Sequence, residues 1–394
     1  MATRPNILLL CPSDPDDQST GGAQRSGFLH RALSRIGEVY TLIPVPLKSL
    51  ETTDANRRVL RRCVEQRRTL GGMLDWLAGR YFQVFSFPSL RRDAVSRSWG
   101  GITFDCVVVR YTHWAAYFRA WELAPLFLDI DDLPVECYRT LHAQPGGSWL
   151  RRNYDAVYER AVAFWSGRIF EKCAGVWLAN REHMRQVGHR NAGWLPNLPR
   201  EPQQEPSALD AQGRYIMSVG LMWYIANRQG VGRFIRNVWP VIRKAHPDLE
   251  YRVAGRDLPE AERRAWEGVD GVRIMGYVED IEAFYRSALF AVAPIDAGSG
   301  TCIKVMEALR LGRVCLATKF AARGLAGLVG EEDGLLIADS DEELAARALW
   351  LLEHPAERLR LQARTTARIK AVCSFEAFAE SVRCVLTKGL GAAG

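Results

Sequence analysis

Apolar residues in the first part of the chain gather in short runs separated by a stretch of helical periodicity. Asn6 to Leu10 is a continuous apolar run of strand length, and Val39 to Ile43 is another. Between them, apolar residues recur three and four positions apart, which predicts a helix over about 23–36. Strand, helix and strand in this order predict a βαβ unit with parallel strands, which bind ligands at their carboxyl ends.

The same alternation continues along the first half. Apolar runs predict strands at 105–109 and 125–130, a long helix is expected over 149–172, and a further strand over 176–179. Polar side chains follow the first strand, in a loop that ends in Gly21-Gly22, and the strand at 125–130 ends in Asp129-Ile130-Asp131-Asp132. Both groups are therefore expected at the ligand-binding edge of one sheet.

A change of composition separates the two halves of the chain. From Leu198 to Gly213 the sequence is rich in Pro, Glu, Gln and Ser, which indicates an interdomain linker. A second alternation begins after it. Strands are expected at 215–220, 249–254, 272–275, 289–293, 314–317 and 335–337, and helices at 227–245, 281–287, 342–352, 356–370 and 375–386. The chain is therefore predicted to be an α/β protein with two doubly wound domains in tandem.

A glycine turn in the second half is the strongest chemical signal. The strand at 289–293 ends at Pro294, and Gly298 and Gly300 then allow a turn whose backbone N–H groups can face a ligand. A helix is expected from Thr301 to about Leu311. The first N–H groups of a helix are unpaired and lie at its positive end, so this arrangement favours phosphate.

Two charged residues lie on the helix that follows this turn. Lys304 and Glu307 are three positions apart and share one helix face. A cation suits a diphosphate and a carboxylate suits ribose hydroxyls, so the pair favours a nucleotide site. An ordinary helix start with solvated charges is the alternative that the turn alone leaves open.

Composition limits the classes of protein to consider. The 394 residues include 48% apolar and 25% charged residues, as in ordinary globular proteins, and no apolar run reaches the ~20 residues of a membrane span. The N-terminal apolar run is too short for a signal peptide. The nine cysteines form no Cys-x-x-Cys pair, which favours reduced thiols and a cytoplasmic protein.

Positive charge is concentrated in one segment. The net charge is +7, and residues 48–100 hold 11 basic and 5 acidic residues, so the rest of the chain is almost neutral and a general nucleic-acid binder is not expected. The arginines from Arg57 to Arg68 are interleaved with leucines, and aromatic residues follow as far as Phe87. We interpret residues 57–87 as helical, in contact with an anionic membrane or an anionic acceptor. A solvated helical insertion is the alternative.

Five segments together resemble a known family. They are Gly21-Gly22 before a helix, Pro196-Asn197, Ser218-Val219-Gly220, Gly276-Tyr277-Val278 followed by Asp280, and the stretch from Gly298 to Glu307 with Ala308 and Gly312. Their order resembles the GT-B glycosyltransferases, and among them the family-4 group of retaining enzymes that use nucleotide sugars. The resemblance covers nearly the whole chain and is strongest over 215–330.

The resemblance implies a GT-B architecture, with two Rossmann-like domains facing a cleft. It places an acceptor domain at 1–205, with the basic insertion at 48–100, and a donor domain at 206–374. The last segment, 375–394, is expected to be a helix that crosses back to the N-terminal domain.

The resemblance also implies the donor-binding residues. These are Gly22, Gly220, Asn227, Gly276, Tyr277, Val278, Gly298, Ser299, Gly300, Thr301 and Glu307, with Glu307 on the ribose. The chain departs from the family pattern at Ser299 and Cys302, where charged side chains are common. Lys304 is then the nearest cation, and Arg228 is expected to replace a lysine of the family, shifted by one position.

Catalytic groups are expected on both domains. Lys304 and Arg228 would stabilise the leaving diphosphate without a metal, and Asp131 or Asp132 would orient the acceptor or stabilise the reacting sugar. His113 and Asn197 are further candidates near the acceptor. Two alternatives stay open: Asp129 or Asp132 caps the following helix, or Asp129-Ile130-Asp131 binds a metal as in GT-A transferases.

The predicted function is glycosyl transfer, of the hexosyltransferase type (EC 2.4), with retention of anomeric configuration. The donor is expected to be a UDP- or GDP-sugar and the acceptor a glycan or a lipid-linked glycan, in the synthesis of a polysaccharide, lipopolysaccharide or glycolipid. No cofactor, metal or nucleic acid is expected, and the protein is predicted to be cytoplasmic, with peripheral membrane contact. A sugar-nucleotide epimerase and a catalytically silent nucleotide-sugar-binding protein are the alternatives.

Overall fold

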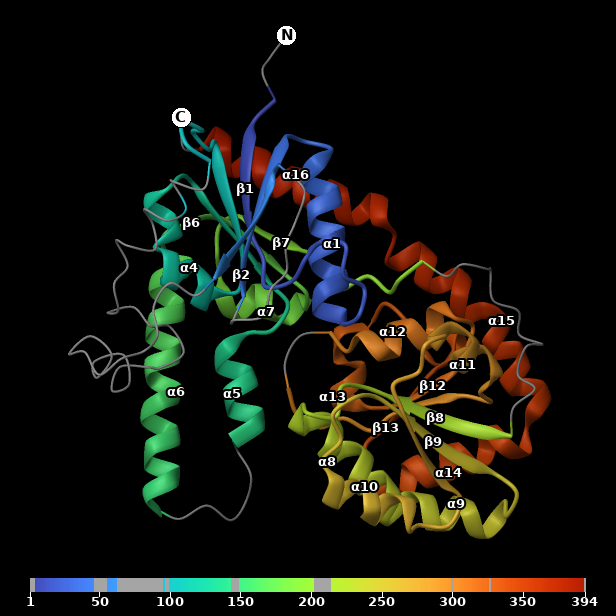
Figure 1. Ribbon diagram of the computed structural model, residues 1–394. Coiled ribbons are helices and arrows are strands. Elements are labelled where there is room, and N and C mark those ends of the chain that lie inside the picture. The colour runs from blue at the N-terminus through green and yellow to red at the C-terminus, as the bar shows by residue number, and fades with distance from the viewer. Residues whose placement is uncertain are drawn as a thin grey trace. The chain divides into compact units, whose positions relative to one another are not determined.

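The chain forms two compact units, each built around one parallel sheet (Figure 1). The structure is a computed structural model that describes residues 4–45, 55–61, 95, 99–142, 149–201, 214–298, 301–325 and 327–392. Unit 1 comprises residues 1–197 and 375–394, and unit 2 comprises residues 198–374. Ser299 and Gly300 lie outside the described residues, as does most of the basic segment from 48 to 100.

Unit 1 holds, within the described residues, a seven-stranded sheet in the order β3-β2-β1-β4-β5-β6-β7. Its strands are β1 (Asn6–Leu10), β2 (Glu38–Val45), β3 (Arg57–Arg61), β4 (Cys106–Arg110), β5 (Leu126–Ile130), β6 (Cys173–Leu178) and β7 (Ala192–Trp194). Leu8 of β1 pairs in parallel with Tyr40 of β2 and with Val107 of β4. The strand order therefore reverses between β1 and β4, where doubly wound sheets bind ligands.

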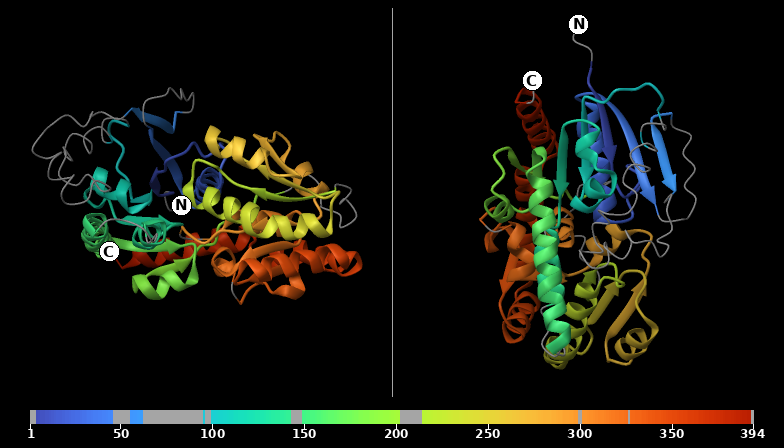
Figure 2. Two further views of the ribbon diagram at one scale, coloured as in Figure 1. Left: turned by 90° about the horizontal axis from the view of Figure 1, so that it is seen from below. Right: turned by 90° about the vertical axis from the view of Figure 1, so that its left-hand side faces the viewer.

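Helices cover both faces of this sheet, as Figures 1 and 2 show. They are α1 (Gly21–Ser34), α4 (Thr112–Phe118), α5 (Pro134–His142), α6 (Trp149–Phe170), α7 (Arg181–Val187) and α16 (Phe375–Gly391). α1 packs against α16, where the ring of Phe28 lies 6.1 Å from that of Phe375 and 6.2 Å from that of Phe378. Because both faces are covered, residues 7–10 of β1 are all fully buried, which explains their unbroken apolar run.

Unit 2 repeats this winding in the order β10-β9-β8-β11-β12-β13. Its strands are β8 (Tyr215–Val219), β9 (Glu250–Ala254), β10 (Val272–Gly276), β11 (Ala291–Ala293), β12 (Cys315–Thr318) and β13 (Leu335–Ala338). Its helices are α8 (Ile225–Arg233), α9 (Trp239–Ala245), α10 (Glu260–Glu267), α11 (Ile281–Ser287), α12 (Ile303–Arg310), α13 (Lys319–Ala322), α14 (Asp341–Glu353) and α15 (Pro355–Val372). The prediction of two doubly wound α/β units in tandem is confirmed.

The helix expected over 227–245 is interrupted by one wider turn. α8 and α9 are joined by a π-helical segment, Phe234–Val238, in which the N–H of Trp239 donates to the carbonyl of Phe234. Pro240 supplies the reason, since its ring would clash with the carbonyl four residues earlier in a regular α-helix. The segment remains helical and packs Phe234 and Trp239 against Tyr251 in the core.

The arginine-rich segment starts as a strand, so the helical interpretation was wrong for residues 57–61. Arg57–Arg61 forms β3, a strand at the end of the sheet that pairs in parallel with β2. The guanidinium of Arg57 lies 3.0 Å from Asp14 and also contacts Asp16, and that of Arg58 lies over the ring of Trp99. The aromatic run from Trp76 to Phe87 lies outside the described residues.

Several expected boundaries shift for local reasons. Gly21 and Gly22 form the first turn of α1 and not a preceding loop, because the Thr20 hydroxyl caps the helix by accepting from the N–H of Ala23. The helices α4, α5, α7, α10 and α13 were not predicted. Among the residues that the structure describes, no helix is both long and apolar enough to cross a membrane.

Candidate functional site

Gly220, Asn227, Gly298, Thr301 and Glu307, five of the predicted donor residues of unit 2, follow the two strands at the switch point of its sheet. The strand order reverses between β8 and β11, and the chain leaves these strands at Gly220 and Pro294. Gly298 has φ 117°, a left-handed conformation that favours glycine. α12 then begins at Ile303, two residues after the buried Thr301, and the side chain of Cys302 makes no capping hydrogen bond to it.

A hydrogen bond joins the first turn of α12 to α8. The ammonium group of Lys304 donates to the side-chain oxygen of Asn227 over 2.7 Å. The side-chain nitrogen of Asn227 in turn donates to the carbonyl of Leu221 over 2.8 Å, and the side chain packs against Gly220. Two predicted donor-binding residues, Gly220 and Asn227, and the predicted catalytic residue Lys304 are thus held together within unit 2.

Glu307 lies one turn further along α12, and its side chain is mostly buried. Its carboxylate is 12% exposed and lies 3.9 Å from the guanidinium of Arg200. Tyr285 is fully buried close by, and burial together with the negative charge of Glu307 raises the pKa of its phenol well above the usual range. Glu307 therefore lies between a neutral phenol and the cation of Arg200.

The contacts of Arg228 differ from the expected contact with the donor diphosphate. Its guanidinium donates to the carbonyls of Met222 and Trp223, both at 3.2 Å, and lies 3.3 Å from Glu262 on α10. These contacts fix the backbone that follows β8. The cation that contacts Asn227 is Lys304, so the charge beside the glycine turn comes from α12.

Aromatic side chains flank the same edge of the unit 2 sheet. Tyr277 follows Gly276, which has φ 63°, and is 68% exposed, with the guanidinium of Arg256 5.6 Å from its ring; Val278 beside it is half-buried. A Cβ atom on Gly298 would lie 2.9 Å from the hydroxyl of Tyr224, so this tyrosine adjoins the glycine turn. Tyr224 was not predicted as a site residue, because nothing in its local sequence pattern distinguishes it from a core residue.

A second cluster occupies the switch point of unit 1. Asp129 is fully buried between two arginines: Arg25 donates to it over 2.9 Å through Nε, and Arg110 over 3.1 Å through Nε. Both arginines are themselves buried. Asp129 is therefore used in a buried ion-pair network, and it does not cap the following helix.

Arg110 extends this network to three predicted residues. It donates to Asp131 over 2.7 Å and to the carbonyl of Gly22, and the hydroxyl of Tyr111 donates to Asp131 over 3.1 Å. The ring of His113 stacks on that of Tyr111 at 5.7 Å. Gly22, Asp131 and His113 are thus brought together, and the neighbouring Asp132 donates its N–H to Asp131 over 3.1 Å.

Tyr111 stands out in this cluster for its backbone and its acidity. Its φ of 71° is unusual for a residue other than glycine, and the chain accepts this conformation directly after β4. Burial raises the pKa of its phenol well above the usual range, and the nearby carboxylates act in the same direction against Arg110. The phenol is therefore neutral at neutral pH and acts as a hydrogen-bond donor.

Asn197, the last residue of unit 1, is tied to the same network. Its side-chain oxygen accepts from Arg25 over 2.9 Å, and the carbonyl of Leu195 accepts from the same guanidinium group, also over 2.9 Å. The Pro-Asn segment at the end of unit 1 is thus held in place by Arg25. Arg25 and Arg110 were not predicted as site residues, since only the folded sheet brings them to Asp129.

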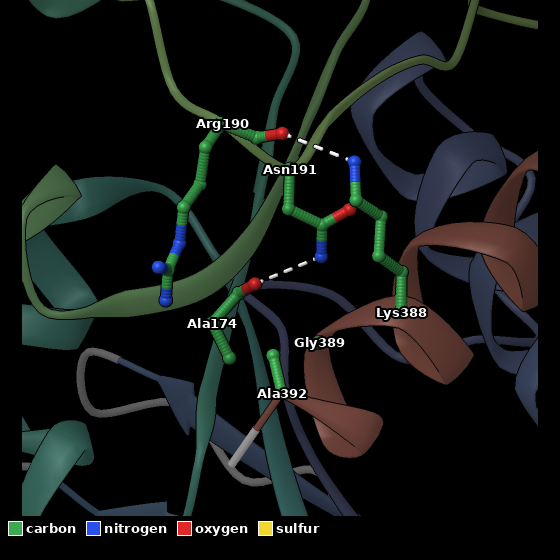
Figure 3. A pocket seen from close by; sticks show the side chains of 6 residues that line it. All are labelled: Ala174, Arg190, Asn191, Lys388, Gly389 and Ala392. Carbon is green, nitrogen blue, oxygen red and sulfur yellow. Dashed lines mark hydrogen bonds between the residues drawn. The ribbon is translucent and has the colours of Figure 1, made fainter.

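A pocket of about 460 Å³ lies elsewhere in unit 1 (Figure 3). Lys388 donates there to the carbonyl of Arg190, and Asn191 donates to the carbonyl of Ala174. Ala174 lies near the start of β6, at the opposite edge of the sheet from Asp131, so this pocket is separate from the predicted residues. Within the described part of the chain, no group of three His, Cys, Asp or Glu side chains is arranged to hold a metal ion.

Comparisons with known proteins agree with this arrangement. Residues 213–354 match the sequence model of a family described as glycosyl transferases group 1. A protein described as an uncharacterized 44.6 kDa protein in the cps region of Klebsiella pneumoniae is 25% identical over 162 residues, which are 39% of this chain. The match spans 41% of that protein, so this chain aligns with less than half of its relative.

Solved structures resemble the chain over most of its length. Sucrose-phosphate synthase from Thermosynechococcus elongatus has a TM-score of 0.72 at 17% identity, covering 99% of this chain and 100% of that one. HepE of Anabaena in complex with UDP-glucose has a TM-score of 0.65 at 13% identity, covering 97% and 99%. TarM of S. aureus, in complex with alpha-GlcNAc-glycerol and UDP, has a TM-score of 0.58 at 12% identity, covering 76% and 58%.

Proposed function

We propose that this chain, which has the GT-B fold, is a group 1 glycosyltransferase and that it transfers a sugar from a uridine diphosphate sugar to a hydroxyl of a glycan or lipid-linked glycan. The observation that carries the proposal is the group formed by Asn227, Lys304 and Glu307 beside the glycine turn of unit 2. HepE, solved with UDP-glucose, and TarM, solved with UDP, support the choice of uridine.

In the proposed reaction, the bond between the anomeric carbon and the diphosphate breaks, and negative charge grows on the leaving phosphate. The ammonium of Lys304 and the unpaired N–H groups at the start of α12 would stabilise that charge. Glu307 would accept hydrogen bonds from the ribose hydroxyls. We assign Asp131, Asp132 and His113 of unit 1 to the acceptor, where Arg110 and Tyr111 hold Asp131 in place.

Substitution of Glu307 tests the donor site. We expect Glu307→Ala to leave the melting temperature close to that of the wild type and to lower kcat/KM for the nucleotide sugar by at least ~100-fold, because charge-assisted hydrogen bonds are lost. Glu353→Ala, an exposed carboxylate at the end of α14, is the matched control and should turn over normally. Equal activity of the two variants would contradict the assignment.

Thermal shift identifies the donor independently of turnover. UDP and UDP-sugars should raise the melting temperature of the wild type more than GDP, ADP or their sugars at equal concentration, since a ligand of the native state stabilises it by mass action. Glu307→Ala should reduce the UDP shift. A larger shift with GDP would indicate a guanosine diphosphate sugar as the donor and would not contradict the assigned donor site.

We further propose that transfer retains the anomeric configuration and needs no metal ion. The leaving phosphate can take the proton of the acceptor hydroxyl, so no enzymic base is required. Lys304 and the N–H groups at the start of α12 take the place of a metal ion at the diphosphate. NMR of the product should show the anomer of the donor, and turnover should persist in excess EDTA. An inverted product, or turnover restored only by Mg²⁺ or Mn²⁺, would overturn this part of the proposal.

A further inference from the structure

The pocket of about 460 Å³ in unit 1 takes no part in the proposed site (Figure 3). Its lining residues come from the start of β6, the segment before β7 and the end of α16: Ala174, Arg190, Asn191, Lys388, Gly389 and Ala392. Its volume lies within the range of about 300–1,000 Å³ that small-molecule sites occupy. The pocket is therefore large enough for a small organic molecule, and it lies at the opposite edge of the sheet from Asp131.

Asn191 offers one polar atom to a ligand of this pocket. The residue is 5% exposed, and its Nδ2 donates to the carbonyl of Ala174 over 2.8 Å and to that of Val385 over 2.9 Å. The side-chain oxygen Oδ1 forms no hydrogen bond with any residue that the structure describes, and it is not closed off from solvent. Polar atoms of buried residues are normally hydrogen-bonded. Because Asn191 lines the pocket, Oδ1 is an acceptor for a donor group of a ligand.

The backbone around Arg190 is held from two sides. The N–H of Asn191 donates to Nδ1 of His189 over 3.1 Å, so the proton of that ring is on Nε2 and is donated to the carbonyl of Cys173, also over 3.1 Å. The carbonyl of Arg190 accepts from the ammonium group of Lys388 over 3.2 Å. These contacts tie the segment to β6 and to α16, and a ligand does not have to order it on binding.

The charges that line the pocket are positive. Arg190 and Lys388 are both exposed, and Figure 3 shows them on two sides of Asn191. The guanidinium group of Arg190 forms no hydrogen bond or ion pair with the described part of the chain. The ammonium group of Lys388 has three N–H groups, and the bond to the Arg190 carbonyl uses one of them. No carboxylate is among the lining residues that the structure describes, and the remaining ones are small and apolar: Ala174, Gly389 and Ala392.

We propose that this pocket binds a small organic anion that carries hydroxyl groups, of the class of phosphorylated polyols. The anionic group lies between the guanidinium of Arg190 and the ammonium of Lys388, where charge-assisted hydrogen bonds form. A hydroxyl group donates to Oδ1 of Asn191, and the carbon skeleton contacts the small apolar residues. The ligand is an effector that binds in addition to donor and acceptor, because the pocket is separate from the residues assigned to both. The proposal does not depend on the proposed function.

Isothermal titration calorimetry of the full chain with glycerol 3-phosphate tests the proposal. UDP is present in excess and the ionic strength is constant, so that the proposed donor site is filled and screening is equal throughout. Arg190→Gln and Lys388→Gln should each bind roughly tenfold more weakly than the wild type, because a hydrogen bond to a charged group contributes about that factor. Arg185→Gln, which changes an exposed arginine of α7 outside the pocket, is the matched control and should bind like the wild type.

The two halves of the probe test its chemistry separately. Glycerol lacks the anionic group, and inorganic phosphate lacks the hydroxyl groups and the carbon skeleton. Each should bind the wild type at least ~10-fold more weakly than glycerol 3-phosphate, since each loses at least one hydrogen bond of the proposed site. Phosphate that binds as tightly as glycerol 3-phosphate would contradict the role of Asn191 as an acceptor.

Ala392→Trp fills the pocket without removing a charge. Ala392 is exposed and lies just beyond the end of α16, so a larger side chain there leaves the core intact and should abolish binding of glycerol 3-phosphate. The melting temperature of each variant shows whether it is folded. No binding by the wild type, or equal binding by the wild type, Arg190→Gln and Ala392→Trp, would overturn the proposal. Absence of a UDP thermal shift in the wild type would contradict the proposed donor site alone.

Discussion

Asp129 lies where two buried arginines converge, at the carboxyl end of β5. Arg25 and Arg110 are 1% and 0% exposed, and the carboxylate itself is inaccessible. Charges buried in this way are compensated only by each other and by their hydrogen bonds. The stability of unit 1 therefore depends on a group that the sequence alone presented as a metal ligand or a helix cap.

Removal of the Asp129 charge should destabilise the protein strongly. Asp129→Asn keeps the size of the side chain but leaves the buried Arg25 without its counter-ion and Arg110 with Asp131 alone, and we expect a loss of about 3–5 kcal/mol in the free energy of unfolding. Urea unfolding followed by fluorescence measures it. Glu376→Gln breaks the exposed pair with Arg35 and is the control, with no resolvable change expected. A small effect of Asp129→Asn would contradict the buried network.

The sequence indicated several site residues but not their partners. Lys304 and Glu307 were expected on one helix face beside the glycine turn, and they occupy successive turns of α12. The contact between Lys304 and Asn227 joins residues 77 positions apart, and the contact between Arg228 and Glu262 joins two helices. Such contacts depend on how helices pack on the sheet, which local periodicity does not encode.

At the level of helices and strands, α8 and the chain after β11 approach each other unusually closely. A Cβ atom on Gly230, in the middle of α8, would lie 2.1 Å from the carbonyl oxygen of Pro294. The close approach brings the helix that carries Asn227 against the segment that leads to Gly298. Glycine at position 230 therefore allows α8 to lie close to the segment after β11, two elements that carry residues of the proposed donor site.

Two helical glycines should respond in opposite ways to the same substitution. Gly230→Ala should lower stability by about 1–3 kcal/mol, because the new methyl group meets backbone and α8 must shift. Gly167→Ala, in α6, meets nothing within 4 Å and should stabilise the protein by about 0.5–1 kcal/mol through helix propensity. Melting temperatures of both variants, with the UDP thermal shift as a second readout for Gly230→Ala, check this. Stabilisation by both would contradict the close packing.

Elements with clear apolar patterns were predicted well, and charged ones were not. The helix at 281–287 and the strand at 6–10 have the predicted bounds. Arg57–Arg61 was predicted as a helix because its five residues, Arg-Arg-Val-Leu-Arg, are too few to distinguish the helical from the strand periodicity. β3 lies at the end of the sheet, where one edge lacks a strand partner among the described residues and charged side chains reach solvent.

The two sheets have the same strand order, and the predicted tandem of doubly wound domains is found throughout the described residues. What the sequence could not supply is the density of the cores. Tyr111, Tyr251 and Tyr285 come from three different elements or their ends; Tyr251 and Tyr285 are fully buried, and Tyr111 is partly buried. Burial raises the pKa of all three phenols.

These phenols predict how stability changes at alkaline pH. In the unfolded chain a tyrosine ionises near pH 10. Because the folded state holds the proton more tightly, it binds more protons than the unfolded state above that pH, and stability falls as pH rises. Absorbance at 295 nm should show at least three tyrosines that stay un-ionised at pH 11 in the native protein and titrate at once in guanidinium chloride. Full ionisation at pH 11 without unfolding would contradict their burial.

Side chains of helix α1 contact both chain segments that connect unit 1 to unit 2. Arg25 binds Leu195 and Asn197, where the chain leaves, while Arg31 lies 3.6 Å from the ring of Phe375 and Arg35 pairs with Glu376, where it returns. Because α1 contacts both connecting segments, a force that displaces either segment acts on the same 14-residue helix. The first turn of that helix contains Gly22, so movement at the two connections would also displace a residue predicted to bind the donor.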